Sequence, residues 1–198
     1  MNNFQTENRV YSLAAVPITL LVFTALGPWL NNALSWNREG LENWQFWRLF
    51  TGHLVHTNLW HGLLNISALA IALYLFGNSE SVKKYLFNII FLCLSISISL
   101  YLFEPWLANY VGFSGVLYGI FALYLIKTLQ QKPLLNTALF IGLSWKVISQ
   151  QMPDFDTNYL RSTIQAKVIV EAHCYGYLCG IVLGVAALIR SFNLKNPR

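Results

Sequence analysis

Long blocks of apolar residues, separated by short polar connections, run along almost the whole chain. Most of the blocks approach the length of a helix that crosses a lipid bilayer, roughly 20 residues. The blocks predict helices at residues 10–30, 51–76, 85–103, 114–129, 134–148 and 166–192. We therefore predict an all-α membrane protein with six transmembrane helices, folded as a single domain over residues 1–198.

The block at residues 114–129 is short for a membrane crossing. As a helix it spans about 24 Å, whereas the hydrocarbon core of a bilayer is about 30 Å thick. Lys127 and Lys132 place one of its ends near a membrane surface, so Ser114 at the other end is expected below the opposite surface. Non-helical backbone at that depth is tolerated only where protein or a water-filled cavity surrounds it. The pattern therefore predicts a short central fourth helix that begins in a wet pocket.

Composition supports a membrane protein: 56% of the residues are hydrophobic and only 11% are charged, compared with about 25% charged residues in soluble domains. The net charge of +5 does not predict nucleic-acid binding, because the basic residues lie at helix ends rather than on one face. The cysteines Cys93, Cys174 and Cys179 lie in apolar blocks and are odd in number, so we expect no disulfide framework. The first block is about twice as long as a signal-peptide core and is expected to remain as a helix.

Basic residues are distributed unequally between the two sets of connections, which predicts orientation. On the predicted basic side, only Glu7 and Glu80 oppose the lysines and arginines. These basic residues are Arg9, Lys83, Lys84, Lys127, Lys132, Arg190, Lys195 and Arg198. We therefore expect this side and both termini in the cytoplasm, and Ser114 toward the outer face.

Ser114 and His173 are the first candidates for chemistry. A serine at a helix start can be an ordinary N-cap, but Ser114 stands in the run Gly112-Phe113-Ser114-Gly115. A histidine within a membrane helix is costly and marks a functional candidate, although it can also form a hydrogen bond that only stabilises helix packing.

Glycines predict how these two residues meet. Gly176 and Gly180 follow His173 at helical spacing, with Gly184 one turn further, and the fourth helix carries Gly115 and Gly119. Stripes of small residues let two helix backbones approach closely. If the stripes face each other, Ser114 and His173 reach hydrogen-bond distance, about 2.6–3.2 Å, which a serine nucleophile requires of its base.

Three further side chains are expected around this pair. His61 and Asn65 share one helical face and suit the hydrogen-bond donors of an oxyanion site, with the backbone N–H of Ser114 as another donor. Tyr118 lies one turn after Ser114, where it either packs on the imidazole or takes part in ordinary helix packing.

The other histidines are expected outside the pocket. On a continuous helix His56 lies about 140° from His61, so we expect it to tie down the adjacent loop. His53 is expected to be solvated or to anchor that loop.

No metal and no cofactor are predicted. His53 and His56 are spaced as in some zinc sites, but no cysteine or acidic ligand accompanies them at helical spacing, and an HExxH motif is missing from the sequence. No aspartate is available for a triad, which leaves a Ser–His dyad. Glu171 points about 200° away from His173 on a helix, so it is not expected to act as a triad acid.

Together these residues resemble the signature of rhomboid proteases, and Trp47-Arg48 resembles the Trp-Arg pair of their first loop. The resemblance covers residues 47–184. It implies a rhomboid-like helix bundle and hydrolysis of a peptide bond in or near the transmembrane segment of a substrate protein. The roles that it implies are nucleophile for Ser114, general base for His173, oxyanion donors for His61 and Asn65, and a ring stacked on the base for Tyr118. His56 matches the histidine that precedes the His-x3-Asn motif in many members.

A narrower resemblance is to rhombosortases, on the compact six-helix form and on the run at residues 47–56. It implies a bacterial inner-membrane enzyme that opens to the periplasm and processes membrane proteins with a C-terminal Gly-Gly, hydrophobic helix and basic tail. Glu171 departs from the general rhomboid pattern, and Trp60 and Gly62 beside His61 leave the pocket shape open.

Two other functions remain as alternatives. A non-proteolytic, rhomboid-like protein would bind membrane clients without reacting with a serine probe. A small transporter would relay protons through His173 and Glu171 and would carry ions without Ser114. The presence of both dyad residues argues against the first alternative, and six helices without an internal repeat argue against the second.

Overall fold

The computed structural model describes residues 3–195 and is mostly helical. Two short strands complete the secondary structure of this part of the chain. The helices are α1 (Asn3–Ala25), α2 (Gly27–Leu34), α3 (Arg38–Glu42), α4 (Arg48–Thr51), α5 (Leu59–Phe76), α6 (Val82–Phe103), α7 (Ser114–Lys127), α8 (Pro133–Gln150), α9 (Asn158–Ile164) and α10 (Val170–Lys195). The strands are β1 (Trp36–Asn37) and β2 (Asn109–Tyr110).

A helix occupies each of the six predicted segments, but several boundaries were wrong. The first segment is divided between α1 and α2, which starts at Gly27 with a proline in its first turn. Proline is favoured there because its missing N–H has no partner within a helix in any case. The last segment begins later than predicted, since α10 starts at Val170.

The largest correction concerns the start of the second predicted helix. Residues 52–58 form a turn, and α5 begins only at Leu59. Asn58 caps this helix, because its side-chain oxygen accepts the backbone N–H of His61 at 2.9 Å. His53 and His56 therefore lie in a loop rather than on a helical face, and the angle expected between His56 and His61 does not apply.

The polar, tryptophan-rich connection before α5 forms a small ordered platform. Its strand β1 pairs in an antiparallel manner with β2, so that Trp36 lies opposite Tyr110. Arg48 is buried and donates to the carbonyl oxygens of Ser35 at 2.7 Å and Asn32 at 3.0 Å. Trp47 donates to a carbonyl of the same connection. The Trp-Arg pair of the resemblance thus holds this platform together.

Helix α7 lies at the centre of the bundle. It packs against α5, α6, α8 and α10, and most of its residues are buried, including both of its glycines. Its closest partner is α10. With 14 residues, α7 spans about 21 Å, so the predicted short central helix is present.

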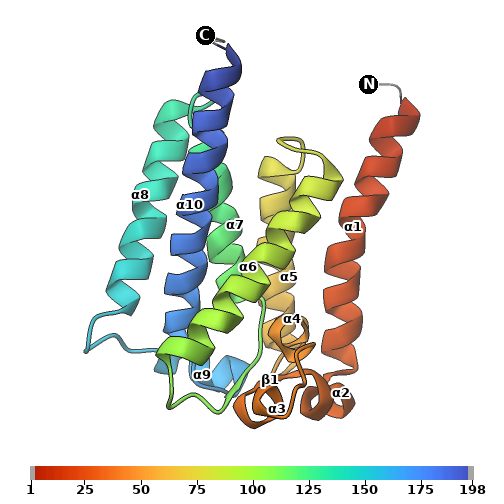
Figure 1. Ribbon diagram of the computed structural model, residues 1–198, viewed down its shortest axis with the longest axis vertical. Helices are drawn as coiled ribbons and strands as arrows, with labels where there is room; N and C mark the ends of the chain where they lie inside the picture. Colours follow the sequence, from red (N-terminus) through yellow and green to blue (C-terminus); the bar gives the residue numbers. More distant parts are fainter. Residues whose placement is uncertain (1–2, 196–198) are drawn as a thin grey trace.

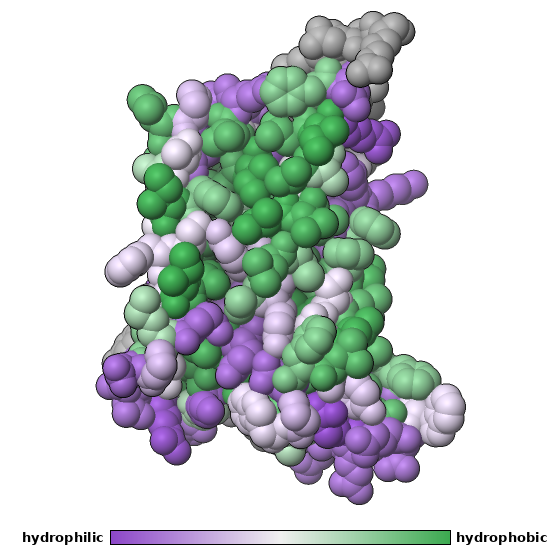
Figure 2. Space-filling model, turned by 60° about the vertical axis from the view of Figure 1, so that its left-hand side comes forward, coloured by the Kyte–Doolittle hydropathy of each residue, from purple (hydrophilic) through white to green (hydrophobic). Residues whose placement is uncertain are grey.

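The outer surface has the polarity expected in a bilayer. Within the described residues, three helices are long and apolar enough to cross a membrane: Leu59–Phe76, Val82–Phe103 and Val170–Asn193. Figure 2 shows apolar side chains over the middle of one face and polar side chains at both ends. Helix α1 starts and α10 ends at the same end of the molecule, and α3, α4 and α9 lie at the other end (Figure 1). These features describe an integral membrane protein.

Candidate active site

The backbones of α7 and α10 lie against each other along their glycines. A Cβ built on Gly115 would come within 2.7 Å of the carbonyl oxygen of Ala172, and one on Gly119 within 2.8 Å of that of Gly176. In return, a Cβ on Gly176 or Gly180 would overlap the carbonyl oxygens of Gly115 and Gly119. The two stripes therefore face each other, and any larger side chain would force the helices apart.

This close approach brings Ser114 and His173 together. Oγ of Ser114 lies 2.8 Å from Nε2 of His173, which is a hydrogen-bond distance. Ser114 is the first residue of α7, and the N-cap position belongs to Phe113, so the hydroxyl of Ser114 is not used as the cap. His173 is only 5% exposed. The predicted contact is present, whereas its catalytic role stays a prediction.

Tyr118 lies on the imidazole, in the first of the two arrangements considered for it. The centroids of the two rings are 4.4 Å apart and their planes differ by 19°. A ring stacked on one face of the imidazole limits its rotation about the Cβ–Cγ bond. This contact follows from position, since Tyr118 comes one turn after Ser114 on the helix that faces α10.

A fourth polar residue, which the sequence reasoning missed, completes this group. Gln150, at the end of α8, places its Oε1 atom 3.0 Å from Nδ1 of His173 and donates through Nε2 to the hydroxyl of Tyr118 at 3.2 Å. A polar residue at the end of an apolar helix is the only sequence signal for it, and many surface residues share that signal.

The candidate oxyanion donors meet at Gly112. This residue has a φ of +119°, which few side chains tolerate, and a Cβ there would lie 2.8 Å from Nε2 of His61. The same Cβ would lie 3.9 Å from Nδ2 of Asn65. His61 and Asn65 therefore line the backbone two residues before Ser114. The conformation of Gly112 is held by its N–H, which donates to Gly52, and by Tyr110, which donates to its carbonyl at 2.8 Å.

The ring of His61 is held from its other side. The backbone N–H of Thr57 donates to Nδ1 at 3.5 Å, and the Thr57 hydroxyl lies 3.0 Å from the same nitrogen. Thr57 also donates to the carbonyl of Ile164, which ties the loop to α9.

The two remaining histidines anchor this loop. Nδ1 of His56 lies 2.9 Å from the hydroxyl of Thr24, and its carbonyl accepts from Asn31, so His56 ties the loop as predicted. Its ring also contacts that of His61, with centroids 4.9 Å apart, which corrects the expected separation. His53 is completely buried and donates to the carbonyl of Cys93 at 3.0 Å. Of the two alternatives expected for His53, the loop anchor is therefore present and the solvated side chain is not.

Glu171 lies in the first turn of α10, where the helix dipole stabilises a carboxylate. The described residues show no hydrogen bond between Glu171 and His173, and they include no group of three or more histidine, cysteine, aspartate or glutamate residues arranged to hold a metal ion. A cavity of about 280 Å³ lies beside His61. Thr57, Tyr110 and Lys167 also line it.

The fold and these side chains define a helical membrane protein with a partly buried serine–histidine pair. The family model described as "Rhomboid domain" matches residues 43–190. The chain therefore belongs to the rhomboid family, whose members are typically intramembrane serine proteases. It is also similar to the protein named "Putative rhomboid protease YdcA" of Bacillus subtilis (strain 168). The two are 29% identical over 189 residues, which cover 90% of this chain and 89% of that protein.

Proposed function

We propose that this protein is an intramembrane serine endopeptidase that uses Ser114 as nucleophile and His173 as general base. The observation that carries the proposal is the distance of 2.8 Å between Oγ of Ser114 and Nε2 of His173. Membership of the rhomboid family and the similarity to a protein named as a rhomboid protease support the same function. In this proposal residues 1–198 act as one domain.

The proposed reaction follows the order of atoms in the site. Nε2 of His173 takes the proton of the Ser114 hydroxyl while Oγ attacks the carbonyl carbon of the substrate. Negative charge develops on the carbonyl oxygen, and His61, Asn65 and the backbone N–H of Ser114 donate to it. His173 then returns the proton to the leaving amine, and a water molecule, deprotonated by His173, hydrolyses the acyl-enzyme. Tyr118 keeps the imidazole oriented through these steps.

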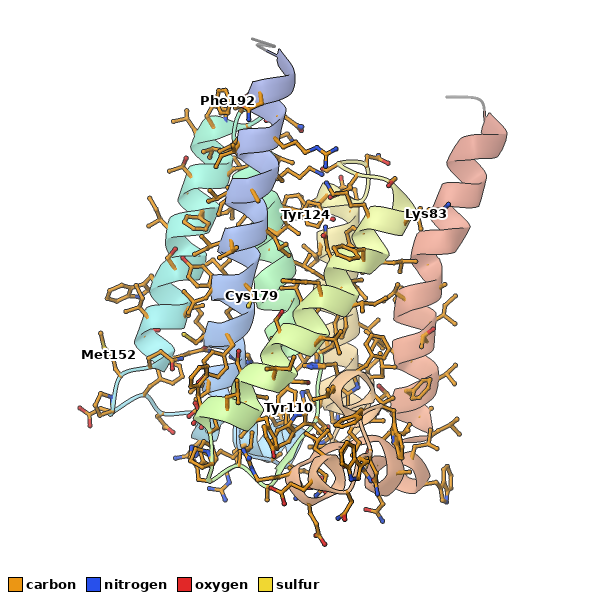
Figure 3. All side chains as sticks on the ribbon, in the orientation of Figure 1. Lys83, Tyr110, Tyr124, Met152, Cys179 and Phe192 are labelled. Carbon is orange, nitrogen blue, oxygen red and sulfur yellow. The ribbon has the colours of Figure 1, made fainter. Side chains whose placement is uncertain are left out.

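We further propose that α1, α5, α6, α7, α8 and α10 all cross the membrane. The basic residues Lys83, Lys127 and Arg190 then lie at the cytoplasmic surface, with both termini on the same side. Lys83 and Tyr110 lie toward opposite ends of the bundle (Figure 3), so the site near Tyr110 opens to the outer side. In a bacterium this places the protein in the inner membrane with its site toward the periplasm.

The proposed substrates are membrane proteins that enter from the lipid bilayer. The resemblance to rhombosortases favours substrates with a C-terminal Gly-Gly, a hydrophobic helix and a basic tail. The cavity beside His61 offers room for part of the substrate peptide.

Co-expression with a tagged membrane reporter tests the function and the substrate separately. The intact protein is expected to cleave a reporter with the Gly-Gly tail, while Ser114→Ala and His173→Ala leave it uncut. A second reporter has the same helix with leucines in place of the two glycines. Cleavage of both reporters would keep the protease and overturn the sorting substrate. Equal cleavage by Ser114→Ala, or binding without cleavage and without labelling by a fluorophosphonate, would overturn the protease.

A further inference from the structure

Gln150 occupies an unusual place for a polar side chain. It lies in the last turn of α8 and is 5% exposed. Most of α8 is exposed, and its buried residues are only Asn136, Val147 and Gln150. A buried amide costs free energy unless both of its ends are hydrogen-bonded. Gln150 meets this condition with His173 on α10 and Tyr118 on α7, and thereby connects three helices.

The orientation of this amide determines the tautomer of His173. A carbonyl oxygen only accepts, so Oε1 of Gln150 requires a proton on Nδ1 of His173. The neutral ring then has a free electron pair on Nε2, the nitrogen that lies 2.8 Å from Oγ of Ser114. This is the tautomer that can take the serine proton.

The opposite amide orientation would have the opposite effect. Nε2 of Gln150 would then donate to Nδ1, and the proton of the neutral ring would move to Nε2, where it could not act as a base toward Ser114. In the observed orientation the other end of the amide is satisfied as well, because Nε2 donates to the hydroxyl of Tyr118 at 3.2 Å. One side chain thus connects the stacked ring and the base.

We propose that Gln150 is a positioning residue, which accepts the Nδ1–H of His173 and holds the base in the tautomer and orientation needed to activate Ser114. The inference rests on the proposed protease function. It assigns Gln150 the place of the acid that a triad has and this dyad lacks. The amide remains neutral, so it stabilises the imidazolium by a hydrogen bond rather than by an opposite charge.

Other groups that face His173 must be held constant in a test. Ser114 and Tyr118 face it from α7, and Lys146 of α8 and His61 of α5 interact with it electrostatically. Glu171 lies two residues away on α10 itself. Substitutions of Gln150 change none of these titratable or charged groups, although they also remove the hydrogen bond to Tyr118. A change in pH dependence therefore reports on the contact between Gln150 and His173.

The test measures the rate of fluorophosphonate labelling against pH, because labelling needs the activated serine but no natural substrate. Gln150→Leu is expected to slow labelling about tenfold to hundredfold, the worth of a hydrogen bond to a group that becomes charged. Gln150→Glu is expected to restore most of the rate. Its carboxylate stabilises the imidazolium, so the acidic limb of the pH profile shifts to higher pH.

A matched control lies on the same helix. Asn136 is also buried, at the opposite end of α8, and donates to Thr128 at 2.8 Å. Asn136→Leu should lower the unfolding temperature without moving the pH profile. If Gln150→Leu does not fold, the comparison of Gln150→Glu with the unaltered protein still gives the shift.

Three results would overturn the inference: an unchanged rate in Gln150→Leu, an unmoved acidic limb in Gln150→Glu, or the same loss in both variants. Failure of the protease itself looks different, because the unaltered protein would then not be labelled at any pH, or Ser114→Ala would still cut the reporter.

Discussion

The two ends of α7 hold buried polar groups in opposite ways. At its start, Ser114, His173 and Gln150 are connected by hydrogen bonds between uncharged groups. At its end, Lys127 lies 2.7 Å from the carboxylate of Glu80. Lys84 contacts the same carboxylate at 2.8 Å, and the Glu80 side chain is 4% exposed. One end is a neutral chain, and the other is a cluster of ion pairs.

The difference teaches what each end can do. In the proposed reaction, a proton moves from Ser114 to His173 in the neutral chain without the separation of an existing ion pair. In the charged cluster, burial alone would raise the pKa of Glu80, but hydrogen bonds from Lys127 and Lys84 lower it below its ordinary value. Glu80 thus stays ionised near neutral pH and joins the connection before α6 to the end of α7. The uncharged groups at the start of α7 suit the proposed proton transfer, whereas the ion pairs at its end stabilise the fold.

The largest expected effect is a loss of activity that follows substitution at the start of α7 but not at its end. Ser114→Ala should reduce cleavage of the reporter by more than about 10⁴-fold, since the nucleophile is lost, with little change in the unfolding temperature. Lys127→Ala should do the reverse and lower the unfolding temperature while folded molecules keep their labelling rate. Rate measurements beside thermal unfolding in detergent check both variants. A comparable loss of activity in Lys127→Ala would contradict the comparison.

A smaller effect is expected for the buried asparagines at the two ends. Asn65→Ala should lower kcat by about 10²-fold, as expected for loss of one oxyanion donor. Its counterpart Asn88 bonds the hydroxyl of Tyr124 at 3.3 Å near the charged cluster. Asn88→Ala should leave kcat unchanged and reduce stability only. Steady-state kinetics on the reporter decide this, and equal losses of kcat would remove Asn65 from the oxyanion site.

The contact between α7 and α10 supports both ends, so its disruption is expected to affect stability and activity together. Gly180→Ala places a Cβ on the carbonyl of Gly119 and should cost about 1–3 kcal/mol, as overpacking does. Gly142→Ala on α8 is the matched control, because a Cβ there meets no atom within 4 Å. Thermal unfolding of the two variants provides the measurement. Equal unfolding temperatures for Gly180→Ala and Gly142→Ala would mean that α7 and α10 can move apart without loss of stability.

The smallest effect concerns pH at the charged end. Glu80→Gln should destabilise the protein by about 1 kcal/mol at neutral pH, allowing for solvent screening of the pairs. Because the folded pKa of Glu80 lies below its ordinary value of 4.5, its stabilisation is complete above that pH and is lost as the pH falls through the lowered pKa. The unfolding temperatures of the two proteins should differ at pH 7 and converge as the pH falls through the lowered pKa of Glu80. If the difference in unfolding temperature stays constant with pH, Glu80 is not the group whose ionisation stabilises this end of α7.

Features that depend on neighbours along the chain were predictable. The helix at residues 85–103 is observed as Val82–Phe103, because a long apolar block satisfies its backbone internally as a helix in a bilayer. The contact of Ser114 with His173 followed from glycines at helical spacing on both helices. The turn at residues 52–58 did not follow, since its apolar residues resemble the start of α5 and only Asn58 marks the cap.

The sequence by itself therefore determined the helical membrane character, the short helix that begins at Ser114, and the faces of α7 and α10 that meet. Only the tertiary structure decided that Gln150 lies at His173 and that β1 pairs with β2. Gln150 is separated from His173 by 23 residues, and residues 151–169 bring it back through α9. The path of such a connection depends on the packing of all its neighbours, and no local periodicity encodes that packing.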